Sequence, residues 1–165
     1  MNPVEKYFNG EKTQCSFGIA MAILSIALAC YFLFSVKTDF YKGIAYPFIL
    51  FSGLLLVVCI SVILRSSTDI ARVNHFVQHE PASIRQKEIP RMRKVMQTFK
   101  NIKIVEICLA LTGLGLLLFS GNFFLKGIGP GLLIQAMLLY GFDIIAESRE
   151  KIYLEFLHGL YLQPF

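Results

Sequence analysis

Three carboxylates in this sequence stand inside or beside apolar stretches, where a charge is costly. Glu106 and Asp143 each interrupt such a stretch, and Glu147 follows Asp143 by four positions. Residues four apart share one face of a helix, where two carboxylates repel unless a proton, a metal ion or an arginine intervenes. At membrane depth such groups often handle ions or protons. Glu106, Asp143, Glu147 and the amide of Gln135 are therefore candidate ion- or proton-handling residues.

A structural interpretation of the same carboxylates stays open. Lys103, Arg65 and Arg149 are expected at about the depth of Glu106 and Asp143. Cations at this level would complete a ring of salt bridges that fixes the helix ends near the membrane interface, where water reaches in. The sequence alone does not separate an ion site from such a ring.

A second constellation pairs two histidines. His75 and His79 are four residues apart, the spacing that places two imidazoles on one helix face as metal ligands require. No third ligand is fixed by the sequence, although Glu80 and His158 could lie near, and a solvated helix face is the simpler interpretation. No nucleophile elbow and no phosphate-binding loop occurs, so we predict no catalytic residue and identify no cofactor.

Four apolar stretches must position these residues. The chain has 165 residues, of which 55% are apolar, and a mean hydropathy of +0.59. A hydrocarbon core about 30 Å thick needs about 20 mostly apolar residues in helical form. We predict an all-α integral membrane protein, a four-transmembrane-helix bundle, with spans at residues 16–36, 43–64, 102–120 and 128–145.

The basic residues predict how the spans are oriented. Thirteen of the 16 Lys and Arg residues lie before the first span, from Arg65 to Lys103 at the start of the third span, or after the fourth, and only Lys37, Lys42 and Lys126 lie in the other turns. Because cytoplasmic loops retain Lys and Arg, both termini and the long middle loop are expected in the cytoplasm. A bacterial inner membrane is the expected location.

The two turns on the outer side resemble each other. Phe40-Tyr41-Lys42-Gly43-Ile44 in the first turn matches Phe124-Leu125-Lys126-Gly127-Ile128 in the second, 84 positions later. The same register pairs Cys59 with Asp143. Two hairpin copies with the same topology would form a parallel internal repeat. The alternative is convergence, because Lys-Gly is a common way to end one helix and begin another at the headgroups.

The segments outside the spans also read as helices. We predict a cytoplasmic helical hairpin over residues 65–101, with a helix to about His79, an irregular corner over 81–89 and a new helix from Pro90, and a C-terminal helix over 146–161. The middle loop, residues 65–103, has a net charge of +6 and residues 143–155 have −2. Basic candidates for binding a partner or lipid headgroups are Arg85, Lys87, Arg91, Arg93 and Lys94.

These observations leave three functional hypotheses. The first is a homo-oligomeric channel or transporter-like protein with an inner-leaflet carboxylate site, since four spans are too few to enclose a path. The second is a non-enzymatic interaction protein, of the assembly, sensor or immunity type, that binds a cytoplasmic partner or anionic lipid through its basic hairpin. The third is a membrane-embedded, metal-dependent lipid enzyme resting on the histidine pair. A nucleic-acid partner is not expected, because no aromatic-basic binding motif is present.

Overall fold

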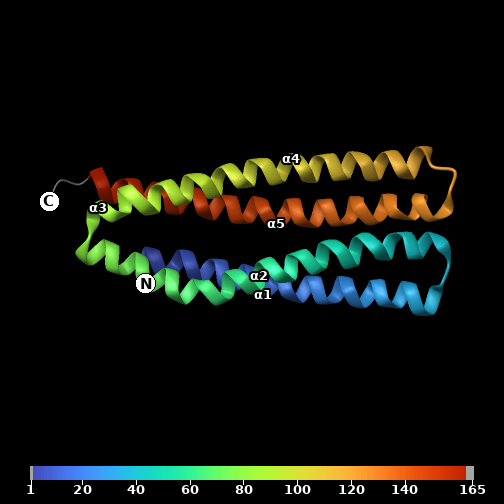
Figure 1. Cartoon of the computed structure of the whole chain (residues 1–165), viewed down its shortest axis with the longest axis horizontal. Coiled ribbons are helices and arrows are strands. Elements are labelled where there is room, and N and C mark those ends of the chain that lie inside the picture. Colours follow the sequence, from blue (N-terminus) through green and yellow to red (C-terminus); the bar gives the residue numbers. More distant parts are fainter. Residues whose placement is uncertain (1, 163–165) are drawn as a thin grey trace.

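The computed structural model describes residues 2–162 and consists of two long helical hairpins (Figure 1). The first hairpin is α1, Pro3–Tyr31, continued by the π-helical turn η1, Phe32–Val36, and then α2, Asp39–His79. The second is α4, Ile89–Phe119, and α5, Phe123–Leu162. Two short pieces join the hairpins, α3 at Pro81–Ser83 and the π-helical η2 at Ile84–Glu88. The predicted all-α, four-helix architecture is confirmed.

Local side-chain chemistry explains where the helices begin and end. The carboxamide oxygen of Asn2 accepts a hydrogen bond from the Val4 amide at 3.2 Å and caps α1. At the far end of that hairpin, Lys37 adopts a left-handed conformation with φ of 58°, which stops the helix. Asn122 starts α5 by accepting from the Phe124 amide at 2.8 Å. These polar turns separate the helices of each hairpin.

The four helices are long and apolar enough to cross a membrane. Large apolar side chains cover their outer faces, for example Leu64 and Met137, which are 74% and 72% exposed. A bundle that turns such residues outward suits lipid as its solvent. Because a span needs only about 20 residues, helices of 29 to 41 residues extend beyond it. The predicted spans at 43–64 and 128–145 fall inside α2 and α5. The span at 16–36 runs from α1 through η1, and the span at 102–120 ends one residue after α4.

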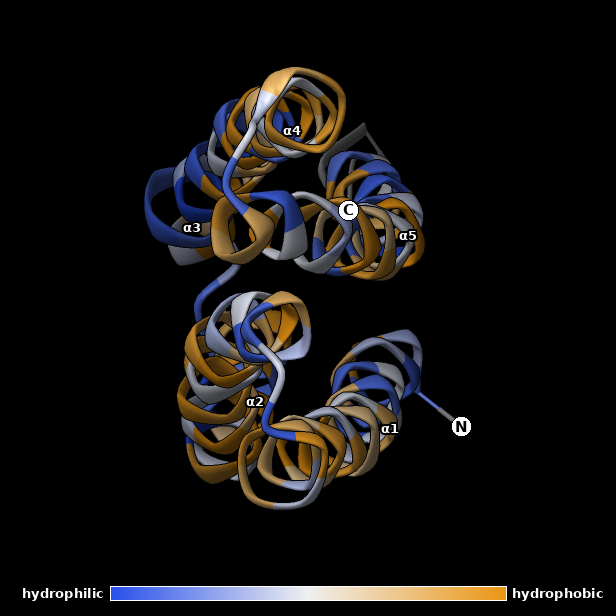
Figure 2. Ribbon diagram, turned by 90° about the vertical axis from the view of Figure 1, so that its right-hand side faces the viewer, coloured by the Kyte–Doolittle hydropathy of each residue, from blue (hydrophilic) through white to orange (hydrophobic). Residues whose placement is uncertain are grey.

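The hairpins meet along their second helices. α2 packs on α5, and near the turns α1 and α4 lie on the outer sides of this pair (Figures 1 and 2). At the opposite end of the bundle the start of α1 also contacts α5. Near the turns the contact of α2 with α5 brings backbone against backbone: Gly43 lies on the carbonyl of Phe124, and Gly127 lies on the carbonyl of Phe40. A β-carbon at either glycine would collide with that carbonyl. Small residues at such positions let helices approach closely in lipid.

A buried apolar core lies where the helices extend past the predicted spans. We call this the terminal end of the bundle, since it holds the start of α1 and the end of α5. Its buried apolar cluster draws on all four helices and η2, and consists of Val4, Tyr7, Phe8, Val73, Phe76, Ile84, Ile89, Met92, Tyr153 and Leu157. The sequence predicted only three extended helices. The start of α1 is the fourth.

The connection between the hairpins differs from the predicted one. α2 ends at His79, as expected, but the irregular corner predicted over 81–89 is wrong, because α3 and η2 carry the chain helically through it. Ile84 and Ile89 anchor this segment in the terminal core, which favours a helical path over an open loop. At the other end of the chain, residues 146–161 continue α5 without a break.

Candidate functional site

Glu106 is the most deeply placed carboxylate of the candidate site. It lies on α4 and is 4% exposed, and its Oε2 atom is buried without a hydrogen-bond partner among the described residues. Asp143, half-buried on the adjacent α5, lies near enough for its charge to act on Glu106. A buried carboxylate oxygen without a donor is costly unless it gains a proton or a cation. The structure therefore brings together two of the predicted residues.

Glu147 has a different environment from Glu106 and Asp143. Its carboxylate bonds to the ammonium of Lys103 on α4 and lies 3.0 Å from that of Lys151. The Lys103 Nζ atom also stands 6.0 Å from the centre of the Tyr140 ring. Glu147 is thus neutralised by cations on both sides, which fits the salt-bridge interpretation for this residue.

The other two cations expected in a salt-bridge ring bond elsewhere. Arg65 faces Asp69 at 3.9 Å, and Arg149 donates to the side-chain oxygen of Gln14. Neither forms an ion pair with Glu106 or Asp143 in the part of the chain that the structure describes. Glu147 therefore forms ion pairs, whereas Glu106 and Asp143 form none among the described residues. The charge of Lys103 nevertheless acts on both of these carboxylates.

Gln135 lies inside the chain and not on an outer face. It is buried between α5 and α2, where its Nε2 atom donates to the Ser52 hydroxyl at 3.4 Å. A small cavity of about 20 Å³ beside it is bordered by Ser25 and Phe142. Since one water needs about 10–15 Å³ of such volume, the cavity has room for about one molecule.

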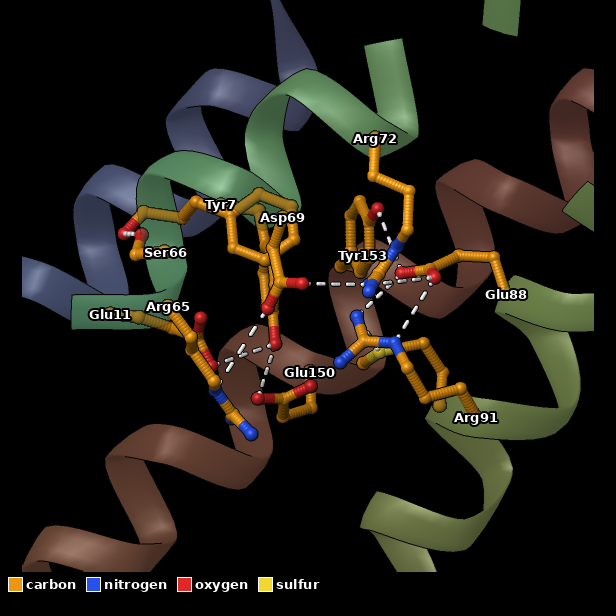
Figure 3. Close-up of polar contacts among 12 residues, drawn as sticks. Tyr7, Glu11, Arg65, Ser66, Asp69, Arg72, Glu88, Arg91, Glu150 and Tyr153 are labelled. Atoms are coloured by element: carbon orange, nitrogen blue, oxygen red, sulfur yellow. Dashed lines mark hydrogen bonds and ion pairs between the residues drawn. The ribbon is translucent and has the colours of Figure 1, made fainter. Parts of the chain in front are cut away.

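The terminal end carries a buried polar network that the sequence did not predict (Figure 3). The Tyr7 hydroxyl on α1 lies 2.5 Å from Oε1 of Glu150 on α5 and 3.1 Å from Oε1 of Glu11. Burial, with smaller effects from the neighbouring carboxylates, raises the pKa of the Tyr7 hydroxyl, so this group stays protonated. Burial also raises the pKa of Glu150, to about 7, and that of Glu11.

The other half of this network neutralises Glu88. This carboxylate, 1% exposed, accepts from Arg91 at 2.5 and 3.0 Å and faces Arg72 at 3.7 Å (Figure 3). The Tyr153 hydroxyl lies 3.5 Å from the same carboxylate. Arg72 also pairs with Asp69 at 2.9 Å on α2, and its contact with Glu88 links α2 to η2. Arg91 is consequently bound inside the protein.

The remaining basic candidates stand at the surface. Arg93 and Lys94 on α4 are exposed and have no ion-pair partner among the described side chains. Lys87 is exposed too, and its ammonium lies 5.4 Å from the centre of the Phe76 ring. Arg85 is exposed on η2 and interacts within the chain. Only part of the predicted basic set is therefore available to bind a partner.

The histidine pair is placed as its spacing predicted. The rings of His75 and His79 are 5.1 Å apart, and both residues are exposed near the end of α2. Within residues 2–162, no group of three or more His, Cys, Asp or Glu side chains is arranged to hold a metal ion. A two-residue site would need ligands from outside this set.

The network residues had weak signals in the sequence. Val4, Tyr7 and Phe8 follow helical spacing ahead of the first span, and Glu150 continues the face of Asp143 and Glu147 at i+7.

Comparisons with protein-family models, with curated protein sequences and with solved structures find no match for this chain. The functional argument therefore rests on the chain's own residues.

Proposed function

We propose that the chain is a membrane protein that binds a proton or small cation at Glu106 and Asp143 and conducts or transports it as a homo-oligomer. The observation that carries the proposal is the buried, unpartnered oxygen of Glu106 beside Asp143. With both termini in the cytoplasm, the orientation favoured by Lys and Arg, this couple lies in the inner leaflet. An ionisable couple at that depth needs a proton or cation to be stable there.

The packing of the two hairpins supports an internal repeat, the architecture on which the proposal builds. Fourteen residues from Glu88 to Leu157 are buried, and eleven of them have a buried residue 84 positions earlier; the other three have a half-buried one. Since 17 of the 70 residues from 4 to 73 are buried, chance predicts three or four matches. The mutual contacts of Gly43 with Phe124 and of Gly127 with Phe40 obey the same register.

The repeat shows what is special about the second hairpin. In the register of 84, Glu106 matches Ala22 and Asp143 matches Cys59, both buried. In the first hairpin this region is closely packed, with the Gly18 backbone close to the Cys59 sulfur. The carboxylate couple thus replaces apolar packing at one of two equivalent places. A cost retained in one copy only is what a functional site predicts.

The size of the internal cavity supports assembly into an oligomer. The space beside Gln135 admits about one water, so it does not provide a path through a single chain. A continuous path must then form between copies, with Glu106 and Asp143 near it. In this arrangement Gln135 acts inside each subunit, as a polar contact with Ser52, and not on the shared axis.

Flux through liposomes tests the proposal. We expect the purified protein to carry protons or a monovalent cation across the membrane in a pH-dye or ion-selective assay. Glu106→Gln and Asp143→Asn should each reduce the flux at least about tenfold, the effect of losing roughly 1.4 kcal/mol of ion stabilisation. Glu155→Gln is the control, because Glu155 is an exposed carboxylate on the same helix. Equal flux in all four proteins, or a monomer in lipid, contradicts the proposal.

A second candidate function rests on Arg93 and Lys94. Two adjacent exposed cations without a partner in the described part of the chain suit an anionic headgroup or an acidic protein surface. We expect Arg93→Glu with Lys94→Glu to weaken binding of the detergent-purified protein to anionic lipid, with thermal unfolding unchanged. Arg91→Glu is the contrast, because it should unfold the terminal end by breaking the pair with Glu88. Unchanged lipid binding in the double variant would remove this candidate.

A further inference from the structure

Tyr7, Glu11 and Glu150 have too few protons for the contacts they make. The Tyr7 hydroxyl has one proton, but carboxylate oxygens of Glu150 and Glu11 both lie within hydrogen-bond distance of it, at 2.5 and 3.1 Å. It donates to only one of them. If both carboxylates were ionised, the other anion would face the lone pairs of the tyrosine oxygen. One carboxyl group must carry a proton for both contacts to be favourable.

A second observation points to the same missing proton. Glu150 is 3% exposed, and its Oε2 atom is buried without a hydrogen-bond partner among the described residues. A fully ionised carboxylate in this position would lack a donor for one of its oxygens, which is costly. A protonated Glu150, or a proton shared with Glu11 through Tyr7, reduces that cost.

From this geometry we propose that Tyr7, Glu11 and Glu150 form a second proton-binding site, which takes up one proton and thereby holds the start of α1 against α5. The site lies at the terminal end of the bundle, outside the predicted spans, and shares no residue with Glu106 and Asp143. It stands independently of the proposed ion flux.

Nearby cations oppose proton binding but do not pair with Glu150. Arg149 donates to Gln14, Arg91 to Glu88, and Arg65 faces Asp69. None of them forms an ion pair with Glu150 or Glu11 in the described part of the chain. The charged and titratable groups that act on the site come from every helix around it: Tyr7 and Glu11 on α1, Arg65 on α2, Arg91 on α4, and Arg149 and Tyr153 on α5.

Burial outweighs these cations and sets the pH range of the site. It raises the pKa of Glu150 to about 7, the direction that favours the neutral carboxyl. A group whose folded-state pKa is raised stabilises the fold at pH values below its ordinary pKa, and this contribution is lost as pH rises through the folded value. The contact between α1 and α5 should accordingly weaken as pH rises from about 4.5 to 7 and stay weak above that range.

The contacts around the site would let the start of α1 move when the proton is lost. Tyr7 stacks on Tyr153 with ring centres 4.0 Å apart, and this is the main aromatic contact of α1 with α5. Beside it lies a groove of about 740 Å³ that is lined in part by Lys6, Gly10 and Arg149. Tyr7 also lines this groove. Loss of the proton would place two anions on one hydroxyl, and α1 would separate from α5, which widens the groove that both helices line.

Hydrogen exchange of the full chain in lipid nanodiscs tests the proposal. We expect residues 3–14 to lose protection as pH rises from about 4.5 to 7, after correction for intrinsic exchange, by up to about tenfold for each pH unit, and the loss to level off above about 7. Glu150→Gln and Glu11→Gln should each remove this pH step, because an amide supplies a permanent donor. Tyr7→Phe should lower protection of the segment even at pH 6.

Two controls separate this site from the proposed ion site. Glu155→Gln should keep the pH step, since Glu155 is an exposed carboxylate on the same helix. Glu106→Gln should keep it too while reducing flux. A pH step that persists in both Glu150→Gln and Glu11→Gln, or protection that does not change with pH in the unmodified protein, overturns the proposal.

Discussion

The two hairpins pack alike but differ in chemistry. In the first hairpin Ala29 and Ala45 are fully buried between α1 and α2; 84 positions later Gly113 and Gly129 bring α4 and α5 backbone to backbone. The second hairpin also has polar groups at apolar positions of the first. Its ion pair of Lys103 with Glu147 matches Ile19 and Ile63, and Glu88, the last residue of η2 just before α4, matches Val4.

This difference teaches that shape and chemistry are separable in this bundle. The two hairpins share most of their buried positions in the register of 84, although several positions of that register are apolar in the first and charged in the second. Since buried charges are rarely more stable than apolar residues of similar size, Glu106 and Asp143, which form no ion pair among the described residues, are the members of this set that fit a functional role. Substitutions that exchange residues between matched positions can break or sharpen this comparison.

The largest effect is expected where the hairpins touch. Gly127→Val should lower the free energy of unfolding by about 3 kcal/mol or more, because its β-carbon meets the rigid carbonyl of Phe40. Gly43→Val should do the same from the other hairpin. Gly115→Ala and Gly53→Ala are the controls, because a β-carbon at either position meets open space. They should be neutral or stabilising by up to about 1 kcal/mol. Denaturant unfolding in detergent measures all four; equal losses would break the comparison.

An intermediate effect is expected at Glu88. Glu88→Val, which installs the matched residue Val4, should cost about 3 kcal/mol, because Arg91 and Arg72 lose their shared buried anion. Adding Arg91→Met should recover part of that loss. The double-mutant cycle, measured by thermal unfolding, isolates the pair. Purely additive losses would show that Glu88 does not depend on Arg91.

The smallest effect is expected at the ion pair beside the candidate site. Lys103→Ile should destabilise the fold by about 1 kcal/mol, because Glu147 keeps its second partner, Lys151. Lys103→Ile with Glu147→Ile restores the residues matched in the first hairpin and should be close to the unmodified protein in stability. A double variant that is less stable than the single one would show that the second hairpin needs this charge for folding.

The number and positions of the long apolar helices could be predicted from the sequence, because a span in lipid needs about 20 mostly apolar residues. Uncharged runs of about 20 residues identify spans without tertiary information. Sequence reasoning failed at the terminal end, where no helix was predicted ahead of the first span although Val4, Tyr7 and Phe8 are buried on α1. The helical spacing of Val4, Tyr7 and Phe8 covers too few residues to be distinguished from chance. The irregular corner predicted over 81–89 was wrong. The two prolines indicated a break in the helix, but the burial of Ile84 and Ile89, which keeps this segment helical, is not visible in the sequence.

The candidate site was foreseen in part for the same reason. Charge at membrane depth marked Glu106 and Asp143, and helical spacing marked Glu147, but only the structure separates the unpartnered Glu106 from the salt-bridged Glu147. Tyr7 and Glu150 were missed because 143 positions separate them and neither is unusual in its local sequence. Arg91 was assigned to a surface because its partner Glu88 lies at a turn whose geometry the sequence did not fix.

A structure of the assembled protein in lipid nanodiscs tests the central claim most directly. The account predicts a homo-oligomer in which Glu106 and Asp143 lie together at inner-leaflet depth, on a hydrated path between copies, while the matched Ala22 and Cys59 stay in dry packing. A monomer, or an assembly in which both carboxylates reach bulk water among the headgroups, would contradict it.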